Sequence, residues 1–305
     1  MPKLIVIVGP TGVGKTKLSL ELAKVFECEI ISSDSRQMYK EMKIGTAKPS
    51  EEELAEIKHH FIDNLSVRDY YNASQFEFEV LSLLQRKFKT CNTMIMAGGS
   101  MLYTDAVCKG IDELPTIDPE IRIKWKSIFE KEGLNSIRTS LKILDPEHYA
   151  EIDKKNHQRI IHALEIIEMT GQKFSSLRTN SIKKREFDIS YIGLNINRDT
   201  LYKGINNRVD KMIETGLLEE VKSLEKFKDL PPLKTVGYKE IFEYMEKNTD
   251  LETSIEHIKR NTRRYAKKQL TWHKKNSNIT WFEPGQTNEI LQHINRAWTI
   301  NSVYP

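Results

Sequence analysis

An apolar run, Leu4-Ile5-Val6-Ile7-Val8, leads directly into the glycine-rich octapeptide Gly9-Pro10-Thr11-Gly12-Val13-Gly14-Lys15-Thr16. A strand that feeds such a turn and then a helix points successive backbone N–H groups at one spot, where a phosphate or diphosphate can bind against the helix terminus. Lys15 would add a positive charge, and the Thr16 hydroxyl would be a ligand of Mg²⁺. We therefore expect this octapeptide to bind a phosphorylated ligand, the alternative being a chance match in an ordinary turn.

Composition sets broad limits on the class of protein. The 305 residues are 39% hydrophobic with a net charge of +4, which suits a globular chain and says little about nucleic acid by itself. No apolar run approaches the roughly 20 residues of a membrane span, and no signal-peptide pattern precedes the first strand. Cys28, Cys91 and Cys108 form no C-x-x-C pair, so neither a disulfide framework nor a zinc site is expected. These features predict a cytoplasmic protein without a membrane segment.

Strands and helices alternate along the first hundred residues. Strands are predicted at 4–8, 29–33 and 93–97, and helices at 15–26 and 74–88. This alternation is typical of a parallel sheet, whose ligands collect at the carboxyl ends of the strands. We therefore predict an α/β fold, a P-loop NTPase-like parallel sheet flanked by helices, with Gly9, Asp34 and Gly98-Gly99-Ser100 at one edge.

Strand signals vanish between about 114 and 182, and helix caps replace them. Asp118-Pro119 and Asp145-Pro146 are typical first positions of helices, Asn156 is a further N-cap, and Gly133 and Gly171 are typical stops. We expect an all-helical insertion at 114–182 between two parts of the core, 1–113 and 183–305. The second part is predicted to hold a strand at 188–196, two helices broken at residue 216, a loop at 231–232, a helix from about 237, a long helix at 251–275 and a strand at 279–282.

The strand at 93–97 ends in Gly98-Gly99, where P-loop ATPases and GTPases usually place a metal-binding carboxylate. This weakens a motor or switch function. The carboxylate at a strand end is instead Asp34, which could take a proton from a nucleophile or hold a metal. The alternative is an aspartate that only caps the following turn. The polar run after it favours the functional role.

The predicted C-terminal helix at 251–275 is strongly basic. Eight cationic residues lie between 259 and 275, and no acidic residue lies among them. Binding of a polyanion such as nucleic acid explains this pattern better than simple exposure to solvent does. The predicted inward stripe is Ile258, Thr262, Tyr265, Gln269 and Trp272. The cations are Lys259, Arg260, Arg263, Arg264, Lys267, Lys268, Lys274 and Lys275.

Together these motifs resemble the tRNA dimethylallyltransferases, and the resemblance covers nearly the whole chain. The family transfers a five-carbon prenyl group from dimethylallyl diphosphate to N6 of adenosine 37, beside the anticodon. The matching segments, in order, are the P-loop, Asp34-Ser35-Arg36-Gln37-Met38-Tyr39, Ile44-Gly45-Thr46-Ala47-Lys48-Pro49, His59-His60-Phe61-Ile62-Asp63, Gly98-Gly99-Ser100-Met101-Leu102-Tyr103, Asp118-Pro119 with Arg122, Gln158-Arg159, Arg208-Val209-Asp210-Lys211-Met212, Val236-Gly237-Tyr238-Lys239-Glu240 and the run from Arg263-Arg264-Tyr265 to Trp272.

The resemblance implies a role for each motif. Lys15, Thr16 with Mg²⁺, and Arg208 would stabilise the departing diphosphate, and Asp34 would be the general base. The partners implied are dimethylallyl diphosphate and a tRNA anticodon stem-loop, expected from tRNAs that read codons starting with U, and the enzyme is expected to be a monomer. The tRNA contacts implied are Asp34, Ser35, Arg36, Gln37, Ser100, Arg122, Gln158, Arg159, Ile160, Ile161, His162, Lys234, Gly237, Tyr238, Lys239, Arg263, Arg264, Lys267, Lys268 and Gln269.

A few positions depart from the family pattern. Ser100 stands where threonine is usual, His162 replaces an arginine of an R-x-x-R-A-L-E run, and Gly204 and Asn207 replace common arginines. No paired Cys or His follows Trp281, so the zinc finger of the eukaryotic members is not expected and the chain resembles the bacterial ones.

Three other functions share parts of this pattern. A prenyltransferase of free adenine nucleotides would use the same P-loop and Asp34 but would have little need of the insertion and the basic helix. A small-molecule kinase would bind ATP at the P-loop, yet no arginine-rich phosphate lid is evident. A non-catalytic RNA-binding NTPase would tolerate the loss of Asp34.

Overall fold

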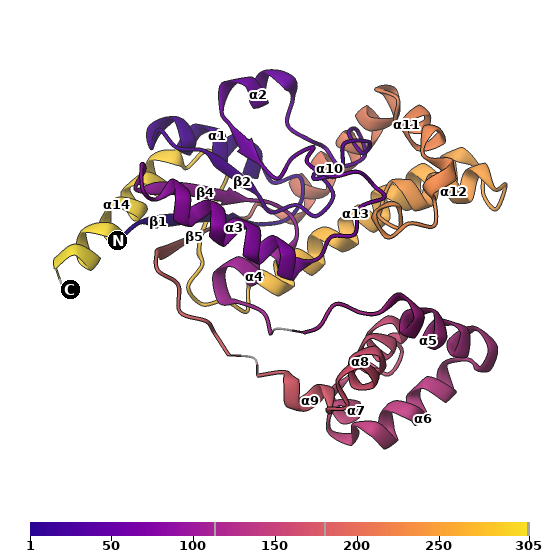
Figure 1. The fold of residues 1–305 in the computed structure, drawn as a ribbon. Coiled ribbons are helices and arrows are strands. Elements are labelled where there is room, and N and C mark those ends of the chain that lie inside the picture. Colours follow the sequence, from indigo (N-terminus) through magenta and orange to yellow (C-terminus); the bar gives the residue numbers. More distant parts are fainter. Residues whose placement is uncertain (113, 180, 304–305) are drawn as a thin grey trace. The chain divides into compact units, whose positions relative to one another are not determined.

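The computed structural model describes residues 1–112, 114–179 and 181–303 (Figure 1). The chain divides into two compact units, one made of 1–108 with 184–305 and the other of Lys109–Lys183. The helical insertion expected at 114–182 lies within the second unit.

The first unit is built on a parallel six-stranded sheet in the order β3-β2-β4-β1-β5-β6. This confirms the predicted α/β class. Its strands are β1 (Lys3–Val8), β2 (Ile30–Ser32), β3 (His59–His60), β4 (Thr93–Ala97), β5 (Asp188–Leu194) and β6 (Thr280–Phe282). Its helices are α1 (Lys15–Val25), α2 (Glu51–Glu56), α3 (Ala73–Lys87), α4 (Met101–Lys109), α10 (Arg198–Glu214), α11 (Leu217–Ser223), α12 (Tyr238–Met245), α13 (Leu251–His273) and α14 (Thr287–Val303), with 3₁₀ turns at Glu225–Phe227 and Pro231–Leu233.

The central strand β1 is buried on both faces, which explains its unbroken apolar sequence. Ile5 and Ile7 pack with side chains of α1, α10 and α14. Leu4 and Val6 point to the opposite face, because side chains alternate along a strand. Figure 1 shows α3 and α4 on that face. Helices on both faces leave the carboxyl edge of the sheet open for a site.

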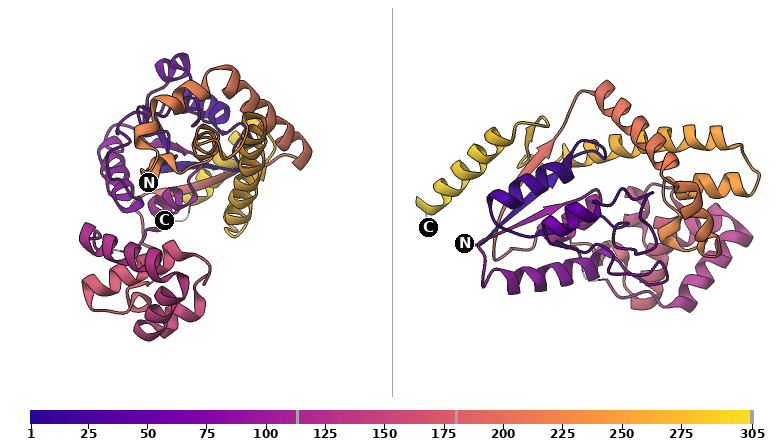
Figure 2. Two further views of the ribbon diagram at one scale, coloured as in Figure 1. Left: turned by 90° about the vertical axis from the view of Figure 1, so that its right-hand side faces the viewer. Right: turned by 90° about the horizontal axis from the view of Figure 1, so that it is seen from above.

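A second core lies beyond that edge, among α10, α11, α12 and α13. It contains Met42 and Val67, which bring the loops after β2 and β3 against these helices. The longest helix, α13, packs against both α10 and α12 (Figure 2). The loops that follow the strands are therefore held between the sheet and the C-terminal helices.

The second unit, taken by itself, is a small helical bundle with its own core around Trp125, Leu141 and Leu164. Each predicted cap is confirmed: Asp118, Asp145 and Asn156 accept hydrogen bonds at helix N-termini, and Gly133 and Gly171 end helices. The helices are α5 (Pro119–Glu132), α6 (Leu134–Leu144), α7 (Pro146–Glu151), α8 (His157–Thr170) and α9 (Phe174–Leu177).

Several of the described elements were not predicted from the sequence, among them α2, β3, α4 and α14. Helix α2 begins at a capping box, in which Ser50 and Glu53 each accept the other's backbone N–H, and this signal was present in the sequence. The predicted loop at 231–232 is a 3₁₀ turn. The three cysteines form no disulfide, and Cys28 and Cys108 are buried. Among the described residues, every helix is too short or too polar to cross a lipid bilayer.

Candidate functional site

The P-loop forms one wall of a cavity of about 240 Å³ at the carboxyl edge of the sheet. Gly14 precedes α1 in the left-handed conformation, with a φ of 99°, so α1 begins at Lys15. The Lys15 ammonium donates hydrogen bonds to the carbonyls of Gly9 and Pro10, at 3.0 and 2.9 Å. The cation is therefore folded back over its own loop and lies where an anion would bind.

Lys15 lies among other charges. Burial, followed by repulsion from Arg208, lowers the pKa of Lys15 to about 8, while Asp34 opposes this shift. An anion bound at the P-loop would favour the charged form of Lys15 and so raise its pKa again.

Arg208 comes from α10, nearly 200 positions away in sequence, and reaches the P-loop. Its guanidinium donates a hydrogen bond to the Thr11 hydroxyl at 2.7 Å. Its Nε atom is buried and has no hydrogen-bond partner among the described residues. A buried donor without a partner is costly unless a ligand satisfies it. Arg208 therefore brings a positive charge to this cavity and leaves one buried donor unsatisfied.

Asp34 follows β2 and lines the same cavity. Its Oδ1 accepts a hydrogen bond from the backbone N–H of Arg36 at 2.9 Å, so it does cap the following turn. Its Oδ2 has no hydrogen bond to any described residue. The capping and functional interpretations are compatible, because one carboxylate oxygen holds the turn and the other is available for a ligand.

The Gly98-Gly99 pair is explained by the approach of two strand ends. A Cβ atom at residue 98 would lie 2.3 Å from the backbone carbon of Ser33, and one at residue 99 would lie 3.1 Å from Oδ2 of Asp34. Any side chain at residue 98, including a carboxylate, would collide with the backbone beside Asp34.

A second cavity, of about 220 Å³, adjoins the first. Both are lined by Asp34, which thus borders the phosphate loop on one side and a separate space on the other. The residues common to both are Thr11, Asp34, Thr46, Ala47, Arg208 and Tyr265.

Ser35 and Ser100 line the second cavity and bind each other. The Ser100 hydroxyl accepts from the Ser35 backbone N–H at 2.8 Å and donates to the Ser35 hydroxyl at 2.9 Å. Arg36 lines the same cavity. Serine at position 100 thus retains the contact that a hydroxyl makes here.

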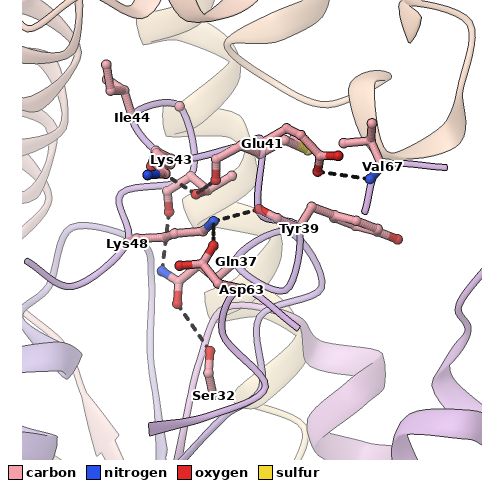
Figure 3. Close-up of polar contacts among 12 residues, drawn as sticks. Ser32, Gln37, Tyr39, Glu41, Lys43, Ile44, Lys48, Asp63 and Val67 are labelled. Atoms are coloured by element: carbon pink, nitrogen blue, oxygen red, sulfur yellow. Dashed lines mark hydrogen bonds and ion pairs between the residues drawn. The ribbon is translucent and has the colours of Figure 1, made fainter. Parts of the chain in front are cut away.

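Gln37, expected to contact tRNA, makes three hydrogen bonds within the protein (Figure 3). Its Oε1 accepts from Ser32 at 3.1 Å, and its Nε2 donates to the carbonyls of Thr46 and Ala47 at 3.3 and 3.1 Å. Gln37 lines the first cavity, and its amide connects the loop after residue 43 to β2.

Gln269 of α13 was also expected to contact tRNA, but it is fully buried. Its Oε1 accepts from the Thr11 backbone N–H at 2.7 Å, and its Nε2 donates to the Gly99 carbonyl at 2.8 Å. The Tyr265 hydroxyl donates to the same carbonyl at 2.7 Å. Burial next to Asp34 raises the pKa of Tyr265. These two residues join α13 to the P-loop and to the end of β4.

The basic face of α13 is smaller than predicted. Lys259 forms ion pairs with Asp210 at 2.8 Å and Glu256 at 3.0 Å, so its charge is paired within the protein. Arg263 is half-buried and donates to Asn206 at 2.6 Å. Arg264, Lys267 and Lys268 are exposed and have no ion pair within the described part of the chain.

The predicted inward stripe of α13 was partly wrong. Trp272 is 38% exposed and donates to Asp105 at 2.9 Å, while Ala266 and His273 are buried instead. The indole N–H needs a polar partner, and a partly exposed position gives it one in Asp105.

The segment around α12 contains both exposed cations and buried residues. Lys234 and Lys239 are exposed, whereas Tyr238 is fully buried and donates to Glu220 at 2.6 Å. A direct contact of the Tyr238 side chain with tRNA is therefore contradicted by its burial. Gly237 lines the second cavity through its backbone.

Within the second unit, Gln158 and Arg159 are exposed on the first turn of α8, and Ile160 and Ile161 are buried in the bundle core. The expected tRNA contacts of these two isoleucines are thus not available to their side chains. Arg122 and His162 lie against Glu165, at 3.3 and 3.6 Å. Burial raises the pKa of Glu165, but the hydrogen bond and charge of these partners outweigh burial and lower it.

Some lining residues were not predicted as site residues. Thr46 and Ala47 border both cavities, yet they were recognised only as part of a matching segment. Glu220, which binds the loop before them, lay in no motif. Only the three-dimensional structure places it against that loop.

Comparisons with known proteins agree with this architecture. The family model described as IPP transferase matches residues 37–276. The tRNA dimethylallyltransferase 2 of Parabacteroides distasonis is 52% identical over 296 residues, covering 97% of this chain and 99% of that relative. The tRNA dimethylallyltransferase 1 of Bacteroides fragilis is 50% identical, covering 95% and 97%.

Solved structures show the same likeness. A crystal structure of the full-length tRNA isopentenylpyrophosphate transferase from Bacillus halodurans matches with a TM-score of 0.73 and 35% identity, covering 99% of this chain and 98% of the other. A eukaryotic dimethylallyltransferase acting on tRNA matches with a TM-score of 0.80 and 27% identity, covering 100% of this chain and 81% of its own. The chain therefore belongs to the IPP transferase family, the family of the tRNA dimethylallyltransferases.

Proposed function

We propose that this enzyme transfers a dimethylallyl group from dimethylallyl diphosphate to N6 of adenosine 37 in tRNAs that read codons starting with U. The observation that carries the proposal is the position of Asp34, which borders both the P-loop cavity and the adjoining one. Two substrates, one in each cavity, would meet at this carboxylate. The names of the relatives support the same reaction.

The first cavity suits the diphosphate. The P-loop, the Lys15 ammonium and the guanidinium-bearing side chain of Arg208 all line it. As the carbon–oxygen bond breaks, its electron pair leaves with the diphosphate, and these donors stabilise the charge that develops. ATP hydrolysis is not required for this use of a P-loop.

The donor set also suits Mg²⁺. The Thr16 hydroxyl lines the cavity and has no protein partner among the described residues. Among the described residues there is no group of three or more His, Cys, Asp or Glu side chains that could hold a metal ion without the substrate. Thr16 together with diphosphate and water oxygens would provide the oxygen ligands that Mg²⁺ prefers, and the bound ion would offset the negative charge of the diphosphate.

Asp34 is the general base in this proposal. Adenine N6 is a weak nucleophile because its lone pair is delocalised into the ring. As N6 bonds to the prenyl carbon, Oδ2 of Asp34 accepts the N6 proton, which contributes about 10²–10⁴ in rate. The adenine must leave the stacked anticodon loop to reach this carboxylate, which costs less in a single-stranded loop than in a duplex.

We propose that tRNA binds through exposed cations of both units. In the first unit these are Lys234, Lys239, Arg264, Lys267 and Lys268, and in the second Arg159 with Gln158. Such groups position the RNA backbone and do not read its sequence. We further propose that the enzyme acts as a monomer in the cytoplasm, together with its tRNA substrate.

Mass spectrometry of nucleosides tests the function. Total tRNA lacking the modification is incubated with the protein, Mg²⁺ and dimethylallyl diphosphate, then digested, and AMP is incubated in parallel. Dimethylallyl adenosine from position 37 is the expected product. Its absence, or more efficient prenylation of AMP than of tRNA, would contradict the proposal.

A further inference from the structure

The loop at residues 43–48 forms a wall between the proposed substrates. Its Thr46 and Ala47 line both cavities. The loop has no regular secondary structure, and Ala47 has a φ of 49°. A non-glycine residue in this left-handed region costs about 1–3 kcal/mol unless neighbouring contacts hold it.

One set of contacts holds the end of the loop (Figure 3). Gln37 donates to the carbonyls of Thr46 and Ala47 and accepts from Ser32 on β2. The Lys48 ammonium, 6% exposed, donates to the Tyr39 carbonyl at 2.6 Å and pairs with Asp63. These contacts connect the wall to the turn that carries Asp34.

The other set of contacts centres on Glu220 of α11. Its Oε2 accepts the backbone N–H groups of Lys43 and Ile44 at 2.9 and 2.7 Å. Its Oε1 accepts the N–H of Gly45 at 3.0 Å and the hydroxyl of Tyr238 at 2.6 Å. Four donors thus converge on one carboxylate, and charge-assisted hydrogen bonds of this kind are stronger than neutral ones.

The Tyr238 ring fixes the distance between loop and helix. A Cβ atom at residue 45 would lie 2.5 Å from the ring, which is fully buried and cannot move aside. Only glycine allows the loop to approach so closely. Gly45 and Tyr238 lie in two different family motifs, and both donate hydrogen bonds to Glu220, which lies in neither motif.

We propose that Glu220 is a positioning residue for prenyl transfer. It holds residues 43–45, so that Thr46 and Ala47 keep the two substrates aligned across Asp34. The inference rests on the proposed function, because it needs a substrate in each cavity. Glu220 lines neither cavity, so its loss should disturb alignment more than binding.

Glu220→Gln tests this role, with Glu219→Gln as its matched control. The amide replaces one acceptor oxygen by a donor, so two of the four donors lose their partner. Glu219 is the exposed neighbour on the same helix and has no ion pair among the described residues. Misalignment on the order of 1 Å can cost about 10²-fold in rate, so we expect kcat to fall roughly 10- to 100-fold in Glu220→Gln and to stay near normal in Glu219→Gln. The KM for dimethylallyl diphosphate should change less than about threefold, because the P-loop contacts remain.

Hydrogen–deuterium exchange supplies a readout separate from activity. The amides of residues 43–45 should exchange faster in Glu220→Gln, while the amides of α11 and of the P-loop helix stay protected. Tyr238→Phe keeps the ring and removes one donor, so it should fold even if Glu220→Gln does not, and its kcat should fall by a smaller factor.

The outcomes separate two kinds of failure. Unchanged kcat in Glu220→Gln, or a loss confined to KM, would overturn the positioning role, as would equal losses in the two glutamine variants. If Glu220→Gln does not fold, a normal kcat in Tyr238→Phe would overturn it. Absence of tRNA prenylation by the wild-type protein would instead overturn the proposed function.

Discussion

Gln269 accepts a hydrogen bond from the backbone N–H of Thr11 at 2.7 Å, although 258 positions separate them in sequence. Arg208 binds the side chain of the same threonine. The phosphate loop is therefore held by two C-terminal helices as well as by its own strand and helix. The helix that presents basic residues to solvent thus also supports the P-loop.

The pKa of Lys15 predicts how substrate use depends on pH. Because its pKa in the free enzyme is lowered to about 8, Lys15 loses its charge as the pH rises through that value. kcat/KM for dimethylallyl diphosphate should therefore fall above about pH 8, since this ratio reports the free enzyme. Initial rates between about pH 6.5 and 9.5 would measure the profile. An identical fall in Lys15→Ala would assign the titration to another group.

Loss of the phosphate-site side chains should show in the first substrate. Thr16→Ala should raise the Mg²⁺ concentration required for activity, and Lys15→Ala should weaken the use of dimethylallyl diphosphate, because each removes a group assigned to that ligand. Neither should change tRNA affinity.

The wild type should show no appreciable tRNA-independent ATP hydrolysis, and brisk ATPase activity would speak against a prenyltransferase.

The exposed cations of α13 should set the salt dependence of tRNA binding. If Arg264, Lys267 and Lys268 contact phosphates, replacing all three by Ala should reduce the slope of log affinity against log salt by about 0.7–0.9 per lost contact. Binding of an anticodon stem-loop across a salt series measures this. Lys89→Ala, exposed after α3, is the control. If the triple variant keeps the wild-type slope, these three residues do not contact tRNA phosphates.

Local signals predicted most of the fold. The apolar strands, the P-loop and the caps of the second unit are all short-range features, and the structure confirms them. Helix α14 was missed because its sequence starts with polar residues and its buried positions, such as Ile290 and Ile294, gain meaning only against β1 and α1. Tertiary packing, not local propensity, defines that helix.

The site was predictable where chemistry lies in a motif. Asp34, Lys15 and Thr16 line the cavity expected of them, and their catalytic roles remain predictions. Gln37, Gln269 and Tyr238 also lie in motifs, but their hydrogen bonds support loops within the protein. A motif shows that a residue type matters at a position, whereas burial and partners show how it acts.

The role of Asp34 is tested by single-turnover kinetics at saturating tRNA and dimethylallyl diphosphate, where product release does not contribute. Asp34→Ala should lower the rate of N6 prenylation by about 10²–10⁴ while tRNA affinity stays close to that of the wild type, because the base acts mainly in the transition state. A single-turnover rate near that of the wild type would contradict general-base catalysis by Asp34.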